Sequence, residues 1–261
     1  MESTYTKVTK DNFITTVEIN NPPANTLSSS CIEELRLVFR NLSNDEETRA
    51  IILTGAGKFF VAGADIKEFV AALGDEEKGL AMAKAGQDLC NEIESMNKPV
   101  IAAINGAALG GGLELAMACH YRIAATSAFV GLPELKLGLL PSFGGTYRLT
   151  KLTDVSTALN LILTSKQLTV DEAKAHGIVQ LVVPQEELLS TARTIAQSFI
   201  EGKSMTSITK VIECIVQGSK ENLQDALERE RSKFAELFLT ADADEGIKAF
   251  IEKRKPSFIH A

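Results

Sequence analysis

The chain has 261 residues, of which 45% are hydrophobic and 23% charged, a composition typical of a globular protein with a substantial core. Its formal net charge of -7 provides no basic excess, so we expect no nucleic-acid partner. No run approaches the ~18 apolar residues of a membrane span, and the polar amino terminus is unlike a signal peptide. The sequence therefore predicts a soluble, cytoplasmic protein without a membrane partner.

The first half of the chain alternates between strand and helix patterns. Residues 13–20 and 50–54 favour strands, and residues 30–42 between them carry apolar side chains at helical spacing. The order repeats with a helix over about 77–96, a buried strand over 100–105, a glycine-rich turn with a helix over 113–119, and a strand over 121–125. Such alternation predicts an α/β core in which helices pack on a sheet.

The second half is mainly helical. Helices are predicted over 154–163 and 169–176, a short strand over 178–183, and further helices over about 186–200, 204–216, 221–238 and 243–253. This change in pattern predicts an α/β core over residues 1–200 and a helical subdomain over 201–261.

Cysteine and histidine are few and widely separated. Cys31, Cys90, Cys119 and Cys214 form no CxxC motif, and the three histidines are equally scattered. The spacing favours reduced, buried thiols over a disulfide framework, and it predicts no metal site.

The stretch over residues 104–124 runs from three glycines directly into an apolar helix. Consecutive glycines permit close approach of the backbone, and a helix start presents N–H groups without internal partners, so Gly110, Gly111 and Gly112 favour a backbone edge that stabilises an anion. Glu114 lies in apolar surroundings, where an ionised carboxylate is costly. Alternatively, the glycines form a tight corner and Glu114 complements the dipole at the first or second helical position.

Two further stretches each place a carboxyl group where the local backbone is constrained. In residues 62–67, AGADIK, Asp65 suits a helix N-cap, and the small residues before it leave backbone N–H groups uncovered. In residues 129–149, Pro133 fixes the backbone just before Glu134. Taken alone, Glu134 favours a loop ion pair with Arg122 or Lys136 over a role in a site.

Together these stretches resemble the crotonase family, the enoyl-CoA hydratase/isomerase superfamily. AGADIK, GAALGGGLELAMAC at 106–119 and GLPELKLGLLP at 131–141 occur in the family's order and spacing, and the resemblance covers nearly the whole chain. It implies an α/β spiral of ββα units, with a C-terminal helical subdomain that joins subunits and covers the active site. It also implies a homotrimer or a dimer of trimers.

The resemblance also implies which residues form the active site. It implies an oxyanion hole formed by the N–H groups of Ala64 and Gly111, and two catalytic glutamates, Glu114 and Glu134. The implied contacts to substrate and coenzyme A are Ala62, Asp65, Ile66, Lys67, Gly110, Pro133, Leu140, Phe143, Phe250 and Lys253. Phe250 and Lys253 match positions that in some members reach the coenzyme A of a neighbouring subunit.

The implied activity is reversible syn hydration of trans-2-enoyl-CoA to 3-hydroxyacyl-CoA in fatty acid β-oxidation, with coenzyme A as part of the substrate and no separate cofactor. Alternatives are an enoyl-CoA isomerase, which commonly needs one acidic residue, and a non-catalytic protein that binds coenzyme A or RNA. One departure affects the site: where many relatives have PGAGGTQRL, this chain has PSFGGTYRL, with Ser142, Phe143 and Tyr147. The bulk of this loop could narrow the acyl tunnel or alter water placement.

Overall fold

In the computed structural model, which describes residues 3–260, the central element is a six-stranded sheet with the order β1-β2-β3-β5-β7-β10. Its strands are β1 (Thr6–Asp11), β2 (Ile14–Ile19), β3 (Ala50–Gly55), β5 (Val100–Ile104), β7 (Tyr121–Ala125) and β10 (Leu181–Val183). All neighbours are parallel except the β1–β2 hairpin. Parallel strands need cover on both faces, and β3, β5 and β10 are accordingly almost wholly apolar, whereas β2 and β7 also carry polar residues.

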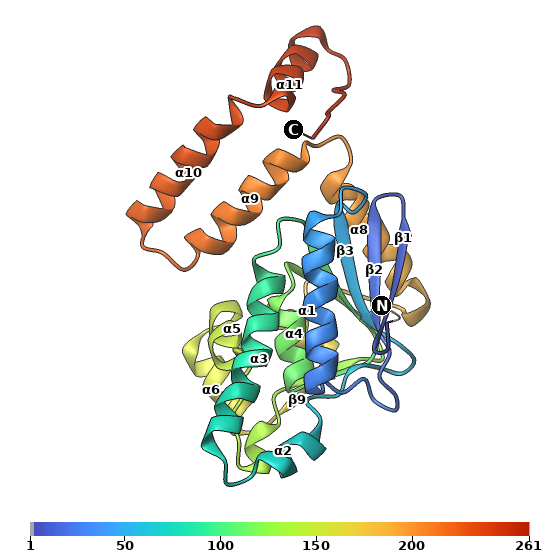
Figure 1. Cartoon of the computed structure of the whole chain (residues 1–261), viewed down its shortest axis with the longest axis vertical. Coiled ribbons are helices and arrows are strands. Elements are labelled where there is room, and N and C mark those ends of the chain that lie inside the picture. The colour runs from blue at the N-terminus through green and yellow to red at the C-terminus, as the bar shows by residue number, and fades with distance from the viewer. Residues whose placement is uncertain (1–2, 261) are drawn as a thin grey trace.

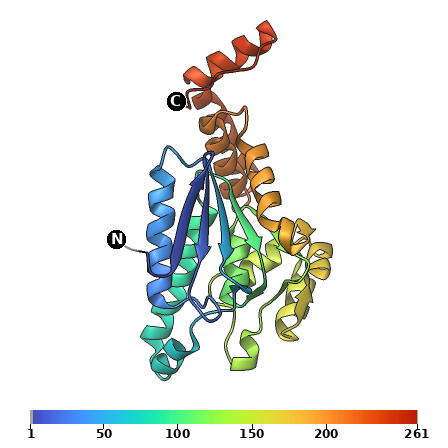
Figure 2. The same cartoon turned by 90° about the vertical axis from the view of Figure 1, so that its right-hand side faces the viewer.

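Alternate residues of each strand face two different helical layers. On β3, Ile51 and Leu53 belong to the core formed with α1 (Ser29–Asn44), α3 (Glu76–Glu94) and α4 (Gly111–Ala118). Ile52 faces the other way, into the core formed with α8 (Leu188–Ile200). The sheet therefore lies between α1 and α8, as Figures 1 and 2 show. The predicted α/β architecture is confirmed.

A second, smaller sheet has the order β4-β6-β8-β9. Its strands are β4 (Phe59–Val61), β6 (Ala107–Leu109), β8 (Phe129–Gly131) and β9 (Gln167–Thr169). The first three are parallel to one another, and β9 is antiparallel to β8. Because parallel strands end at the same edge, the segments that follow β4, β6 and β8 are brought together.

The remaining elements surround this core or extend from it. They are α2 (Ile66–Ala72), the 3-10 turns η1 (Glu134–Leu137) and η2 (Gln185–Glu187), α5 (Gly145–Leu152), α6 (Val155–Leu163), α7 (Val170–Ala175), α9 (Met205–Gly218), α10 (Leu223–Leu237) and α11 (Ala241–Glu252). Figure 1 shows α9, α10 and α11 projecting from one end of the sheet core, with α2 at the opposite end. The division of the chain into domains at residue 200 stays a prediction.

Several local predictions were wrong or incomplete. Strand β1 was not predicted, because five of its six side chains are exposed and its sequence, TKVTKD, is polar. The strand predicted over 178–183 covers only Leu181–Val183, and the buried residues Ile178 and Val179 precede it. The three-residue strands of the second sheet are too short for a period of two to reveal them.

The cysteines, the helices and the metal-binding residue types give three further observations on the described residues. All four cysteines are free, and all except the half-buried Cys214 are buried. Within residues 3–260, no helix has the length and apolar character needed to cross a membrane. Over the same residues, no group of three or more His, Cys, Asp or Glu side chains is arranged to hold a metal ion.

Candidate active site

The candidate site lies where β4, β6 and β8 end. β4 leads into Ala62–Ala64, β6 leads into Gly110 and the start of α4, and β8 leads into Pro133 and Glu134. A hydrogen bond from Gly110 N to Gly131 O (2.9 Å) holds the last two segments together. Three stretches that are far apart in the sequence therefore meet at one edge of the small sheet.

Close packing at this edge depends on two glycines. Gly110 has φ 53° and ψ -125°, a conformation that strongly favours glycine, and it brings the chain into the first turn of α4. At Gly112, a Cβ would lie 2.1 Å from the carbonyl oxygen of Val61, so a side chain there would separate α4 from β4. The glycine run thus places the start of α4 directly against the end of β4.

Two backbone N–H groups at this edge are available to a ligand. Ala64 forms an isolated bridge with Leu27, in which Leu27 N donates to Gly63 O (2.9 Å) and Asp65 N donates to Leu27 O (3.1 Å). Among residues 3–260, the N–H of Ala64 has no acceptor. Gly111 is the first residue of α4, and the N–H of a first helical residue has no partner within the helix. Both residues line the same cavity.

Glu114 is buried, with 2% of its surface exposed, and its carboxyl group is held in place by backbone donors. Its Oε1 accepts hydrogen bonds from Phe143 N (2.8 Å) and Gly145 N (2.6 Å). Burial raises its pKa to about 8, with a further contribution from nearby Glu134 and opposition from the two N–H donors. Glu114 is the fourth residue of α4, so its predicted alternative position at the first or second was wrong.

Glu134 begins the η1 turn and contributes the second carboxyl group. Its Oε2 is buried and has no hydrogen-bond partner within residues 3–260, and burial raises its pKa. Its Oε1 lies 2.8 Å from the point where a Cβ on Gly110 would stand, so glycine at position 110 makes room for it. The ion pair considered with Arg122 is not formed, because Arg122 donates to the carbonyl oxygens of Ile178 and Cys119.

Both carboxyl groups face a cavity of about 670 Å³ with a mainly apolar lining. Ten of the predicted site residues line it: Ala62, Ala64, Ile66, Gly110, Gly111, Glu114, Pro133, Glu134, Leu140 and Phe143. The lining also includes apolar side chains that the sequence did not single out, such as Phe69 on α2 and Met82 on α3. The sequence does not distinguish them, because apolar residues at helical spacing predict core packing as readily as they predict a cavity lining.

Four predicted site residues are not among those that line the cavity of the single chain. Asp65 caps α2 by accepting from Lys67 N (2.9 Å), and Lys67 follows it on the helix. Phe250 on α11 has 86% of its surface exposed, and Lys253 ends that helix in a left-handed conformation. Figure 1 shows α11 at the opposite end of the molecule from α2. Contacts of Phe250 and Lys253 with this cavity would therefore need a second subunit.

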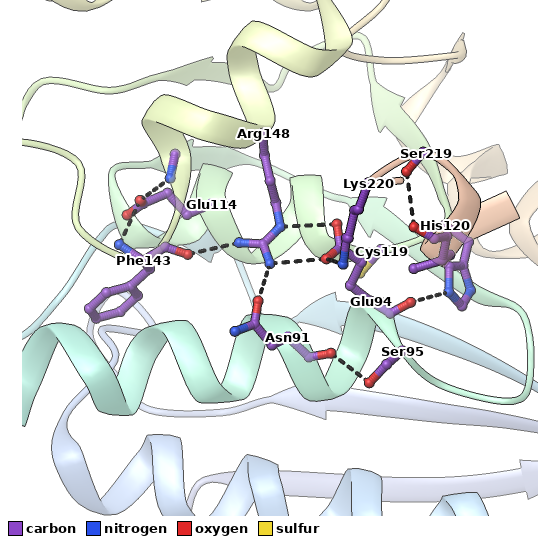
Figure 3. A network of polar contacts seen from close by, with 12 residues as sticks. Asn91, Glu94, Ser95, Glu114, Cys119, His120, Phe143, Arg148, Ser219 and Lys220 are labelled. Carbon is purple, nitrogen blue, oxygen red and sulfur yellow. Dashed lines mark hydrogen bonds and ion pairs between the residues drawn. The ribbon is translucent and has the colours of Figure 1, made fainter. Parts of the chain in front are cut away.

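Arg148 on α5 supports the loop that holds Glu114, although its sequence pattern did not single it out as a site residue. Its Nη1 donates to Phe143 O (2.9 Å) and its Nη2 to Asn91 Oδ1 (2.7 Å), while Glu94 lies 3.4 Å away. Glu94 also accepts from Lys220 of the α9–α10 connection (2.7 Å), and Figure 3 shows the complete network. The available signal was the position of Arg148 beside Leu149 on the apolar face of α5.

The arrangement suits a reaction in which negative charge develops on a carbonyl oxygen while protons move at nearby carbon atoms. Two fixed N–H donors can stabilise such an oxygen. Burial raises the pKa of both carboxyl groups, that of Glu114 to about 8, which suits proton transfer by Glu114 near neutral pH. The geometry therefore suits the class of enzyme that combines acid–base chemistry with stabilisation of an oxyanion.

Comparison with known proteins narrows this class. Residues 9–260 match the family described as enoyl-CoA hydratase/isomerase. The chain is 46% identical to a probable enoyl-CoA hydratase of Bacillus subtilis (strain 168), covering 95% of this chain and 96% of that protein. It is 40% identical to a short-chain-enoyl-CoA hydratase of Clostridium acetobutylicum, covering 98% and 97% respectively. A crystal structure of an enoyl-CoA hydratase from Bacillus anthracis superposes with a TM-score of 0.92 at 37% identity, covering 99% of this chain and all of the other.

The chain belongs to the enoyl-CoA hydratase/isomerase family. The predicted crotonase fold and family membership are both confirmed.

Proposed function

We propose that the protein catalyses the reversible syn hydration of trans-2-enoyl-CoA to 3-hydroxyacyl-CoA in fatty acid β-oxidation. The observation that carries the proposal is that the buried carboxyl group of Glu114 and the half-buried carboxyl group of Glu134 line one apolar cavity beside the N–H groups of Ala64 and Gly111. The names of the B. subtilis and C. acetobutylicum relatives support the same activity.

The reaction begins with polarisation of the thioester. The carbonyl oxygen accepts hydrogen bonds from the N–H groups of Ala64 and Gly111, and each such donor stabilises a developing oxyanion by about 3 to 4 kcal/mol. Withdrawal of electrons toward this oxygen makes the conjugated β-carbon electrophilic. The N–H groups thus act before and during water attack.

The two carboxyl groups hold the attacking water and move its protons. One, as the carboxylate, accepts a proton while the water oxygen forms a bond to the β-carbon and the double-bond electrons shift toward the thioester oxygen. The other, as the carboxylic acid, delivers a proton to the α-carbon when the enolate collapses. Burial raises the pKa of both carboxyl groups, and the charge of Glu134 raises that of Glu114 further, to about 8, so Glu114 favours its protonated form at neutral pH.

The second carboxyl group also favours hydration over isomerisation. A Δ3-Δ2-enoyl-CoA isomerase shuttles one proton between two carbon atoms and can use a single acidic residue. Here Glu134 faces the cavity with an unpartnered buried oxygen, where it can hold a water molecule. A protein that only bound coenzyme A or RNA would have no use for this pair of carboxyl groups.

We further propose that the protein assembles as a homotrimer or a dimer of trimers through the helices of residues 201–261. These helices carry large apolar side chains that remain exposed on the single chain, among them Phe234 (63%), Phe238 (64%) and Phe250 (86%). A surface of this kind supports burial against another subunit. It would also allow Phe250 and Lys253 to reach the coenzyme A of a neighbour, while Asp65 and Lys67 contact it from α2 of their own chain.

Hydration of crotonyl-CoA tests the proposed activity. Loss of the enoyl-thioester absorbance, together with formation of 3-hydroxybutanoyl-CoA, would support a hydratase. Turnover of 3-enoyl-CoA without any hydration would identify an isomerase instead. Binding of coenzyme A thioesters with no turnover of either substrate would identify a binding protein.

A further inference from the structure

The cavity stops abruptly along α3. Its lining on this helix includes Glu76, Gly79, Met82 and Ala83, which recur at helical spacing on one face. The next position on that face is Gly86, which is buried and does not line the cavity. The ring of Phe143 occupies this position, because a Cβ on Gly86 would stand 2.1 to 2.3 Å from three of its carbon atoms. Phe143 is therefore the wall at this end of the cavity.

The ring is enclosed on both edges. The Cδ1 and Cε1 atoms face Gly86 of α3, and the Cδ2 and Cε2 atoms lie 3.2 Å from the position of a Cβ on Gly111 of α4. Only 5% of the Phe143 surface is exposed. The ring thus fits between two glycines, and either glycine would disturb it if it carried a side chain.

The backbone around Phe143 is fixed as well. Gln87 Nε2 donates to Ser142 O (2.9 Å), Phe143 N donates to Glu114 (2.8 Å), and Arg148 Nη1 donates to Phe143 O (2.9 Å). These three hydrogen bonds come from three different helices. They fix the backbone from which the ring projects, so a longer ligand could move the ring only by rotating the side chain out of its fit between Gly86 and Gly111.

We infer that Phe143, seated on Gly86, closes the acyl end of the cavity and restricts the enzyme to short-chain enoyl-CoA substrates. The inference rests on the proposed function, which places the thioester oxygen at Ala64 and Gly111 and the β-carbon between the two carboxyl groups. The acyl chain beyond the β-carbon then passes the carboxyl group of Glu114. The next side chain it meets is Phe143, whose own N–H binds that carboxyl group.

The test compares kcat/KM for hydration of crotonyl-, 2-hexenoyl-, 2-octenoyl- and 2-decenoyl-CoA. In the wild type, kcat/KM should fall as the acyl chain lengthens from crotonyl to decenoyl. In Phe143→Ala, the vacated space should accept further methylene groups, each worth about fourfold in kcat/KM when buried. The ratio of octenoyl to crotonyl activity should rise by at least about tenfold, and Phe143→Leu should give an intermediate ratio.

Two further variants distinguish a specific effect of Phe143 on chain-length preference from the effect of a general loss of stability. Phe129→Ala removes the same side chain from β8, outside the cavity lining, and should leave the chain-length ratio unchanged. Gly86→Ala places a methyl group against the ring and should reduce turnover of every substrate. Adding Phe143→Ala to Gly86→Ala should recover turnover of crotonyl-CoA, because the clash is removed.

The outcomes are distinct. A wild-type enzyme that hydrates 2-decenoyl-CoA as efficiently as crotonyl-CoA overturns the inference, and so does a Phe143→Ala variant with an unchanged ratio. If no enoyl-CoA is hydrated, the proposed function fails, and calorimetric binding of butanoyl-CoA and octanoyl-CoA tests the wall alone. If the wild type binds butanoyl-CoA more tightly than octanoyl-CoA and Phe143→Ala abolishes this preference, the role of Phe143 as a wall is supported. If the wild type binds both ligands equally, that role is overturned.

Discussion

Replacing Glu114 by glutamine should stabilise the protein progressively as pH rises above about 5, while it removes a proposed catalytic group. The carboxyl group is 2% exposed, and its pKa is raised from 4.5 to about 8, first by burial and then by Glu134. A glutamine side chain has the same shape, and its amide oxygen can still accept from Phe143 N and Gly145 N. The substitution therefore removes the cost of ionising a buried group and keeps the hydrogen bonds.

Proton linkage gives the sign and the size of the change in the free energy of unfolding. Because the folded-state pKa is raised, the folded protein binds more protons than the unfolded chain between pH 4.5 and about 8. The contribution of Glu114 to the free energy of unfolding is therefore fully present below pH 4.5 and is lost as pH rises through 8. At about 1.4 kcal/mol per pH unit, the loss reaches about 3 kcal/mol at pH 7 and about 5 kcal/mol above pH 8.

Urea denaturation of wild type and Glu114→Gln at about pH 5, 7 and 9, all at one protein concentration, measures this difference. The variant should gain little near pH 5 and progressively more at the higher values. As a control, Glu172→Gln should have the opposite effect at neutral pH, because a hydrogen bond from Lys166 lowers the pKa of Glu172 to about 2. A Glu114→Gln gain that stays constant with pH would refute the reasoning.

Three further perturbations test other parts of the site and assembly. Gly111→Pro deletes one N–H donor and should reduce kcat by at least about 100-fold; near-normal turnover with an unchanged circular dichroism spectrum would contradict the assignment. Arg148→Met removes the donor to Phe143 O and a positive charge that lowers the pKa of Glu114. The alkaline limb of the pH profile of kcat/KM should therefore move to higher pH, and a limb at the wild-type pH would contradict this role of Arg148. Analytical ultracentrifugation should show a trimer or hexamer whose stability falls in Phe234→Ser, and a stable monomer at micromolar concentration would exclude the proposed assembly.

The elements predicted correctly from sequence are those with strong local signals. Strand β5 is wholly apolar, and the glycines at the start of α4 mark a close backbone approach: a Cβ on Gly112 would have no room beside Val61 O. Glu114 was singled out because a carboxyl group within an apolar helix requires a special environment, and it does line the cavity; its catalytic role stays a prediction. Family resemblance then supplied Ala64 and Glu134, whose local sequence also fits an ordinary helix cap or ion pair.

Features that depend on distant contacts were not predictable in this way. Strand β1 exists through its pairing with β2, although its own sequence is polar. The donors to Glu114 come from Phe143 and Gly145, which are 29 and 31 residues away along the chain. The fit of Phe143 on Gly86 joins a loop to a helix, and neither sequence alone indicates the other.

The central claim is that Glu134 makes this site a hydratase, and the most direct measurement compares two reactions of Glu134→Gln. Hydration of crotonyl-CoA and isomerisation of a 3-enoyl-CoA are followed for wild type and variant, with acyl-CoA binding as the check on folding. Glu134→Gln should bind normally and lose at least about 100-fold in kcat for hydration, because glutamine cannot transfer the proton. Hydration at the wild-type rate would contradict the claim and leave Glu134 as a structural residue of the η1 turn.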